Sequence, residues 1–143
     1  MIASKEENEE TVQPGERNNN MSIIGNILWI ILGGGIIIFL LYVLGGVFLC
    51  LTIVGIPFGV QCLKLATLGL IPFGKVITSS PSATGTINVI LNVLWIITFG
   101  LTIAATHIVL ALILGLTIIG IPFARQHIKL ASLAITPFGH NFY

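Results

Sequence analysis

The stretch TIVGIPFGVQCLKLATLGLIPFG, residues 52–74, returns with few changes as TIIGIPFARQHIKLASLAITPFG at residues 117–139. Asn26–Ile30 likewise matches Asn92–Ile96, so the second half of the chain repeats the first at an offset of 65 to 66 residues. Internal repeats of this kind recur in membrane transport folds, and they also occur in membrane proteins that transport nothing. The chain is therefore expected to fold as two copies of one unit.

The two copies share a long apolar segment, residues 23–54 and 86–119, that contains no Asp, Glu, Lys or Arg. Charged residues make up 8% of the chain, against about 25% in soluble domains, and the mean hydropathy is +1.05. All five acids lie in the first sixteen residues, and the only formal charges after Arg17 are Lys64, Lys75, Arg125 and Lys129. The sequence therefore predicts an all-α integral membrane protein whose membrane part is purely cationic.

Both apolar segments are too long for one ordinary crossing, because about 20 residues span the hydrocarbon layer. A straight helix of this length would be on the order of 50 Å long and would need a tilt beyond the usual range. In one topology, each copy crosses once and its proline-bounded helix lies in the interface. In the other, each copy is a hairpin with a first helix to about Tyr42, a turn near Gly45–Gly46 and a return helix to Pro72.

The positive-inside rule favours the hairpin, because the hairpin can place all six Lys and Arg on one side of the membrane. The second copy argues against it, since Leu110–Ala111 stands where the first copy has Gly45–Gly46. Both topologies give an even number of crossings. The two ends of the chain are therefore expected on the same side of the membrane, in the cytoplasm.

The sequence divides into four segments. Residues 1–21 are polar and acidic and are expected to form a disordered tail. This tail has no basic n-region, so it is not expected to be a signal peptide. Residues 22–74 form the first membrane repeat, residues 75–85 a polar linker rich in Ser, Thr, Pro and Gly, and residues 86–143 the second membrane repeat.

Glycine and proline mark the ends of a helix of about four turns in each copy. A glycine ahead of that helix can adopt the left-handed conformation that ends the preceding helix. A proline in the first turn loses no hydrogen bond, and a second proline disfavours the α conformation in the residue before it. The predicted helix breaks are Gly55, Pro57 and Pro72 in the first copy and Gly120, Pro122 and Pro137 in the second.

Each proline-bounded helix carries its polar residues at a spacing of three, which places them in one narrow stripe on a mostly apolar cylinder. Cys62 and His127 fall outside the stripe. A cation inside the bilayer is costly unless it reaches the headgroups or a polar cavity. The stripe is therefore expected to contact anionic headgroups or to form a polar seam between repeats or subunits. It contains Gln61, Lys64 and Thr67 in the first copy and Arg125, Gln126, Lys129, Ser132 and Thr136 in the second.

The doubled pattern GIPF-x-x-Q-x-x-K-L-A-x-L…PFG, preceded each time by a long Gly-rich apolar arm, resembles the YccF family of small inner-membrane proteins. The resemblance covers roughly residues 26–139. It implies a multi-pass protein of the bacterial inner membrane, built from the inner-membrane component domain. The family has no established biochemical activity, so the resemblance carries over no catalytic or binding residue. The two copies differ at Phe123–Arg125, where the first copy has Phe58–Val60. The acidic tail looks like an addition to the family's core and indicates nothing about that core.

The second apolar segment also carries polar residues. One helical face holds Asn88, Asn92, Thr98, Thr102 and Thr106, and another holds Gly100, Ala104, Ala111 and Gly115. Small residues allow helices to approach closely, and threonines commonly bond to carbonyls one turn back, so helix packing is favoured over a water-lined path. His107 is the only ionisable residue deep in a segment and is a candidate functional site. It has no carboxylate partner, and the hairpin topology places it near the turn, close to water.

The membrane segments lack a carboxylate pair, a Ser-His-Asp set, metal-ligand spacing and a phosphate-binding loop; the Gly33–Gly35 run is interpreted as a feature of an apolar helix. The sequence predicts a structural or accessory component, such as one of a transport system, without enzymatic activity or cofactor. Its expected partners are membrane lipids, chiefly anionic headgroups, and a second copy or another membrane protein, but not nucleic acid. The alternative is a small oligomeric channel or transporter.

Overall fold

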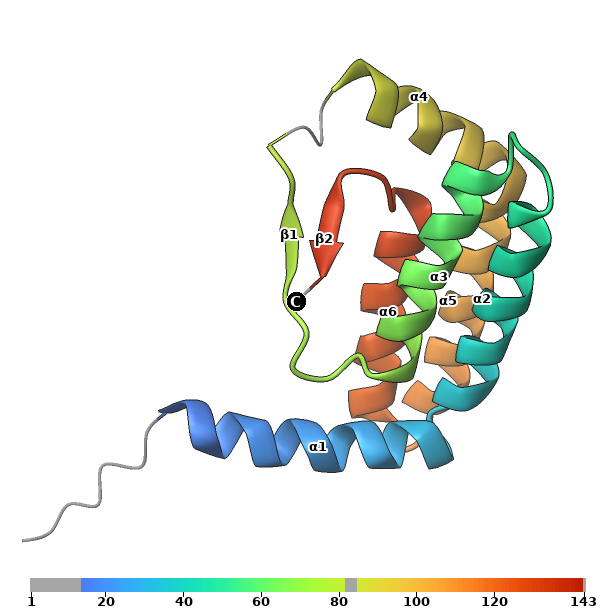
Figure 1. The fold of residues 1–143 in the computed structure, drawn as a ribbon. Coiled ribbons are helices and arrows are strands. Elements are labelled where there is room, and N and C mark those ends of the chain that lie inside the picture. Colours follow the sequence, from blue (N-terminus) through green and yellow to red (C-terminus); the bar gives the residue numbers. More distant parts are fainter. Residues whose placement is uncertain (1–13, 82–84, 143) are drawn as a thin grey trace, which may run out of the picture.

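A computed structural model describes residues 14–81 and 85–142 of the chain. Residues 1–13, most of the predicted tail, lie outside this part, and α1 already begins at Pro14 within the tail. The chain is mostly helical (Figure 1). In order, its elements are α1 (Pro14–Leu32), α2 (Gly35–Cys50), α3 (Ile56–Leu70), β1 (Ile77–Ser79), α4 (Thr86–Trp95), the π-helical turn η1 (Ile96–Gly100), α5 (Leu101–Gly115), α6 (Ile121–Ile135) and β2 (His140–Phe142).

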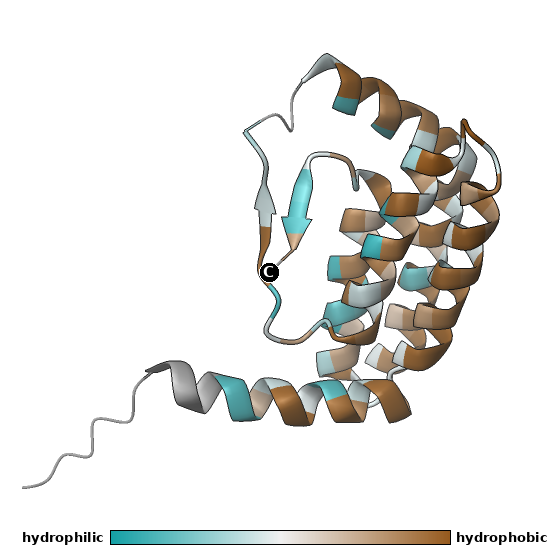
Figure 2. Ribbon diagram, in the orientation of Figure 1, coloured by the Kyte–Doolittle hydropathy of each residue, from teal (hydrophilic) through white to brown (hydrophobic). Residues whose placement is uncertain are grey.

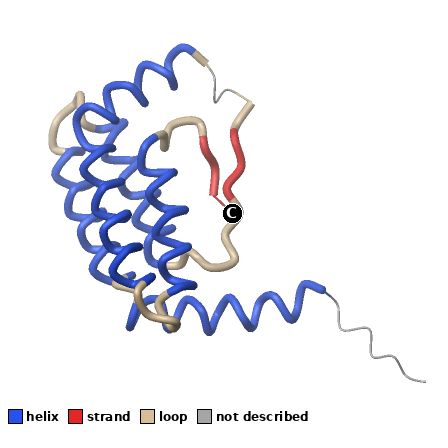
Figure 3. Tube along the Cα trace, turned by 180° about the vertical axis from the view of Figure 1, so that it is seen from behind, coloured by secondary structure: helices blue, strands red, loops and turns tan. Residues whose placement is uncertain are grey.

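Two helix hairpins, α2–α3 and α5–α6, form a four-helix bundle, and α1 and α4 run across its two ends (Figure 1). The strands β1 and β2 pair antiparallel and form a short ribbon beside the bundle. Seen from either side, this ribbon lies beyond one flank of the bundle, toward which the N-terminal end of α1 also points (Figures 1 and 3). The ribbon falls at the predicted linker and at the end of the second repeat, and an all-α fold did not predict it.

The glycine run at residues 33–35 breaks the first apolar segment. Gly34 adopts a left-handed φ of 75°, and the helices on its two sides are bent by 76°. The interpretation of this run as part of an apolar helix is therefore wrong. The second segment continues through η1 as one helical stretch, Thr86–Gly115.

A difference of one residue explains why only one segment breaks. Gly35 and Gly100 both lie against the indole ring of the preceding tryptophan, so that no side chain fits at either position. The first repeat places five residues between Trp29 and its glycine, whereas the second places four between Trp95 and its glycine. The extra residue is accommodated by the bend at the left-handed glycine.

The hairpin turns lie at residues 51–55 and 116–120, so the predicted turn at Gly45–Gly46 is wrong. Those two glycines lie inside α2, which explains why the second repeat needs no Gly-Gly pair. In each turn a threonine hydroxyl donates to a carbonyl three residues back at 3.0 Å, and it accepts a bond from the amide of the glycine before the next helix at 3.1 Å and 3.0 Å.

The turn glycines do not adopt the predicted left-handed conformation. Gly55 and Gly120 have right-handed φ values of −78° and are the N-caps of α3 and α6. A Cβ at either position would collide with the carbonyl of the leucine six residues earlier, Leu49 or Leu114. These positions therefore require glycine for space rather than for a positive φ, and the following prolines lie in the first turn of each helix.

Close approach of α2 and α3 is possible because glycine faces glycine. A Cβ at Gly59 would collide with the sulfur of Cys50 and lie 2.6 Å from the carbonyl oxygen of Gly46. The second hairpin places Ala111 and Ala124 at the equivalent positions. Both hairpins thus depend on small residues, as is common where helices pack in membranes.

The substitution Gly59→Ala is expected to destabilise the protein by about 1–3 kcal/mol, because the added methyl overpacks a backbone contact. Gly45→Ala is the matched control, since nothing lies within 4 Å of a Cβ at that position of the same hairpin. This control is expected to be neutral or to stabilise by about 0.5–1 kcal/mol through helix propensity. Thermal unfolding in one detergent compares the two. Equal melting temperatures for both variants would contradict the packing argument.

Equivalent residues of the two repeats make equivalent hydrogen bonds. The indole N–H of Trp29 donates to the carbonyl of Gly69, and that of Trp95 donates to the carbonyl of Ala134, both at 2.7 Å. Asn26 exchanges two hydrogen bonds with the backbone of Phe73. In the second repeat, Asn92 does the same with Phe138. The residues that the sequence retains in both copies therefore fix the start of each segment to the end of its proline-bounded helix.

The two repeats are related by a two-fold axis through the ribbon and the bundle. Ile77 of β1 pairs with Phe142 of β2. Phe142 is the residue of the second repeat that is equivalent to Ile77, 65 positions later. The aromatic residues follow the same symmetry across the repeats. Phe123 packs on Trp29 and Phe73, while its equivalent Phe58 packs on Trp95 and Phe138. Each repeat thus completes the core of the other.

The outer surface of the bundle is strongly apolar. The turns between the paired helices expose Ile53 and Ile118, each by 88%. Figure 2 shows hydrophilic residues on the ribbon and on the flank of α3 and α6 that faces it, and hydrophobic residues over the rest of the bundle. By length and composition, Thr86–Gly115 could cross a bilayer, and the bent pair Asn19–Leu32 and Gly35–Cys50 passes the same criterion if taken together.

Candidate functional site

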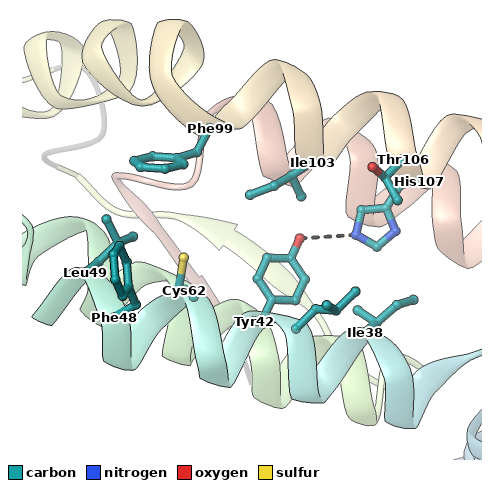
Figure 4. A pocket seen from close by; sticks show the side chains of 11 residues that line it. Ile38, Tyr42, Phe48, Leu49, Cys62, Phe99, Ile103, Thr106 and His107 are labelled. Atoms are coloured by element: carbon teal, nitrogen blue, oxygen red, sulfur yellow. Dashed lines mark hydrogen bonds between the residues drawn. The ribbon is translucent and has the colours of Figure 1, made fainter.

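A chain of buried polar groups crosses the middle of the bundle. The Tyr42 hydroxyl lies 3.1 Å from Nε2 of His107, a contact that Figure 4 shows. Nδ1 of His107 lies 2.9 Å from Nδ1 of His127, and Nε2 of His127 lies 3.2 Å from the carbonyl oxygen of Gly33. The three side chains come from α2, α5 and α6, and His107 and His127 are 2% and 0% exposed.

The carbonyl at one end fixes the direction of every hydrogen bond in this chain. Because the Gly33 carbonyl only accepts, Nε2 of His127 must carry the proton, and a neutral His127 then accepts at Nδ1. His107 must therefore donate from Nδ1 and accept at Nε2, which leaves the hydroxyl of Tyr42 as the donor to His107. All three side chains are neutral and mutually satisfied in this arrangement, which buried polar groups require.

Sequence reasoning placed His107 wrongly and did not single out His127. His107 lies in the middle of α5 rather than near a turn, and it has two polar partners. His107 is the repeat equivalent of Tyr42, and His127 is the equivalent of Cys62. The signal that could have revealed the site is therefore the change of residue type at these two positions between otherwise similar copies. The axis brings the equivalent positions Tyr42 and His107 into contact.

A cavity of about 220 Å³ opens beside Tyr42 and His107. Apart from the polar atoms of Tyr42, His107, Cys62 and Thr106, it is lined by apolar residues of α2 and α5 and by Phe99 of η1 (Figure 4). Because the Tyr42 hydroxyl donates its proton to His107, the tyrosine oxygen can only accept a hydrogen bond from a molecule in this cavity.

The residues of the predicted polar stripe lie in different environments in the structure. Gln61 is 9% exposed and Gln126 is half-buried, and Oε1 of each has no hydrogen-bond partner among the described residues. Lys64 and Arg125 are exposed. Lys129 is half-buried and donates to the carbonyl of Lys75 at 2.8 Å and to that of Pro72 at 3.5 Å. The contacts of Lys129 join the second repeat to the end of the first.

The predicted threonine face lies on the outside of the second apolar segment. Thr98, Thr102 and Thr106 are exposed. Thr98 donates to the carbonyl of Leu94 at 2.7 Å, and Thr106 donates to that of Thr102 at 2.9 Å. The hydroxyls of Thr98 and Thr106 are therefore satisfied by their own helix. The three exposed threonines do not form a shared polar channel within the described part of one copy of the chain.

The prolines that follow the two helices lie in the core. Pro72 and Pro137 are among the fully buried side chains, and α3 and α6 end just before them. Gly74 and Gly139 then adopt left-handed φ values of 81° and 90° and lead the chain into the ribbon region. The PFG motif of each repeat is therefore a turn that positions the ribbon, a role the sequence did not indicate.

Comparisons with known proteins agree with the repeat and with the membrane character. The model of the YccF family, described as an inner membrane component domain, matches residues 24–75 and again residues 90–140. Two curated relatives are each called inner membrane protein YccF, one from Escherichia coli (strain K12) and one from Shigella flexneri. Each is 29% identical over 131 residues, which cover 85% of this chain and 86% of the relative. No solved structure matches the chain.

Proposed function

Because the chain belongs to the YccF family of inner-membrane proteins, we propose that it is a non-enzymatic structural or accessory component of the bacterial inner membrane. In this proposal, two re-entrant repeats hold it in the bilayer, and it acts through contacts with lipid headgroups and with membrane proteins. The observation that carries the proposal is the separation of its surface into one polar, cationic flank and an apolar remainder (Figure 2).

The ribbon supports one particular placement of the molecule in the membrane. A two-stranded sheet has open edges, and open edges do not occur where backbone faces hydrocarbon. In this proposal the ribbon therefore lies in water or among headgroups. The two-fold axis, which passes through the ribbon, then runs along the membrane normal, and the hairpins lie within the bilayer.

The helices α1 and α4 are suited to this placement because both begin on the ribbon flank and run toward the far side (Figures 1 and 3). The apolar part of α1, residues 21–32, is about 18 Å long, which is roughly half of a 30 Å hydrocarbon layer. Each repeat would thus enter and leave the bilayer on the same side. By the positive-inside rule, the lysines on the ribbon flank favour a cytoplasmic location for that side and for both termini.

The polar chain in the core supports a structural role. Every donor in the chain from Tyr42 to Gly33 has an acceptor, so the chain links three helices and leaves no group poised for a reaction. The sequence also has no carboxylate after Arg17 that could take part in acid–base chemistry with either histidine. A satisfied buried network of this kind fixes one arrangement of helices.

A small oligomeric channel or transporter is the second candidate. It is favoured by breaks at corresponding positions of two repeats, the sequence feature that most often marks a transport site. In this structure the threonines face outward, so a path would have to form between copies of the chain. Reconstitution into liposomes separates the two candidates. Flux of ions or small solutes that Thr102→Leu abolishes would establish the channel, and the structural proposal predicts no flux in either protein.

A further inference from the structure

We propose that a cavity between α3 and the ribbon binds a phosphate group, presented by the headgroup of an anionic membrane lipid. The cavity has a volume of about 250 Å³. It is lined by residues of both repeats: Lys64, Thr67 and Leu68 of α3, Lys75 ahead of β1, and His140, Asn141 and Phe142 of β2. The inference rests on the proposed function, because it requires the ribbon flank to lie at the headgroups.

Two lysines, Lys64 and Lys75, line this one cavity. The sequence contains no Asp or Glu between Arg17 and the C-terminal Tyr143. Two like charges that share a partly enclosed space repel each other unless an opposite charge is bound. A bound anion would remove this repulsion, and a phosphate oxygen is a strong acceptor for lysine N–H groups.

Several polar groups at the cavity have no partner in the described part of the chain. Nδ1 of His140 is buried without a hydrogen bond, and the side chains of Lys64 and Asn141 form none with described residues. The hydroxyl of Thr67, by contrast, already donates to the carbonyl of Lys64 at 2.8 Å. The free groups are mainly N–H donors, which matches a ligand rich in acceptors.

The two-fold symmetry supplies an internal comparison. Lys129 is the repeat equivalent of Lys64, and it lines a related cavity of about 190 Å³ with Ile77, Ser132 and His140. Its ammonium is already engaged by the carbonyls of Pro72 and Lys75. The lysine of this second cavity is bonded to two carbonyls, whereas the side chains of both lysines of the first cavity form no hydrogen bond within the described part of the chain. The lysine at this position therefore stabilises the fold in the second repeat, as Lys129, and is available to bind a ligand in the first repeat, as Lys64.

The chemistry of the cavity favours a phosphate monoester over a diester. A monoester carries about −1.5 to −2 charges near neutral pH and offers three terminal oxygens, which suits two ammonium groups and the amide of Asn141. Phosphatidic acid is a membrane lipid with such a headgroup. The cavity is therefore expected to prefer phosphatidic acid to phosphatidylglycerol, and both to zwitterionic phosphatidylcholine.

The test is native mass spectrometry of the full chain in detergent, titrated separately with these three lipids and with inorganic phosphate. Wild-type protein is expected to retain phosphatidic acid most strongly. Lys64→Gln is expected to weaken that retention about tenfold, the effect of losing one charge-assisted hydrogen bond. Arg125→Gln is the matched control, because it removes an exposed cation that does not line the cavity. Because it lies outside the cavity, it is expected to weaken the retention of phosphatidic acid much less than Lys64→Gln does.

Equal weakening in Lys64→Gln and Arg125→Gln would overturn the proposal, because it would show general attraction to a cationic surface. Displacement of phosphatidic acid by inorganic phosphate at a similar concentration would show that free phosphate, not lipid, is the ligand. Unchanged melting temperatures exclude misfolding as the cause of any loss. Site-directed labelling of the ribbon tests the proposed function separately, so a ribbon at the headgroups without lipid preference would refute the phosphate site alone.

Discussion

Replacing Trp29 by alanine is expected to lower the free energy of unfolding by about 3–5 kcal/mol, the usual cost of removing a large aromatic side chain from a core. Trp29 is fully buried and contacts Phe73, Phe123 and His127. Its indole also bonds to the carbonyl of Gly69. Loss of the ring would therefore open a cavity where both repeats meet, and thermal or denaturant unfolding in detergent measures the cost.

Trp29→Phe is the matched control for this prediction. It retains much of the ring but removes the N–H that satisfies the buried carbonyl of Gly69, so a smaller cost of about 1–3 kcal/mol is expected. Because Trp95 makes the same bond in the second repeat, its alanine variant is expected to lose a similar amount. A marginal effect of Trp29→Ala would contradict the shared aromatic core.

The second large effect is expected from His127→Leu. This change keeps the side chain near its original volume but leaves the N–H of His107 and the carbonyl of Gly33 without partners. Each unsatisfied buried group costs about 1–3 kcal/mol, so a total loss of about 2–6 kcal/mol is expected. The melting temperature in detergent should fall accordingly, and the loss should not depend on added lipid.

The directed hydrogen-bond chain also predicts how substitutions combine. Tyr42→Phe, His107→Leu and His127→Leu together would leave only the Gly33 carbonyl unpaired, so the triple variant should lose less stability than the sum of the three single variants. Residues in one hydrogen-bond network show such coupling, whereas independent sites do not. Additive losses would mean that the three side chains do not act as one chain.

Much of the fold could be predicted from the sequence because the residues that mark the repeat, chiefly its prolines, allow few structural alternatives. The prolines at positions 57 and 122 lie in the first turn of α3 and α6, and these 15-residue helices have the expected length. The turns were misplaced because Gly45–Gly46 is equally compatible with a bend and with close helix packing. Only the position of Gly59 across from Gly46 distinguishes the two.

The candidate sites were harder to predict because they depend on contacts between the repeats. Periodicity grouped Lys64 and Lys129 as equivalent members of one stripe. Their different roles arise from the three-dimensional arrangement of the ends of the repeats, which brings carbonyls to Lys129 but not to Lys64. The partnership of His107 with His127 and Tyr42 likewise needs the two-fold axis, which a one-dimensional pattern does not specify. Polar contacts across such an axis are therefore visible only in the structure.

The placement of the molecule in the membrane is tested most directly by cysteine labelling in a background that lacks Cys50 and Cys62. Single cysteines are introduced by Thr78→Cys in the ribbon and by Ile53→Cys and Ile118→Cys in the two hairpin turns, all exposed in the structure. With a membrane-impermeant maleimide, Thr78→Cys should react only from the cytoplasmic side, and both turn positions should be protected from either side. Labelling of Ile53→Cys and Ile118→Cys from opposite sides would show that the hairpins span the bilayer, which would contradict the re-entrant arrangement.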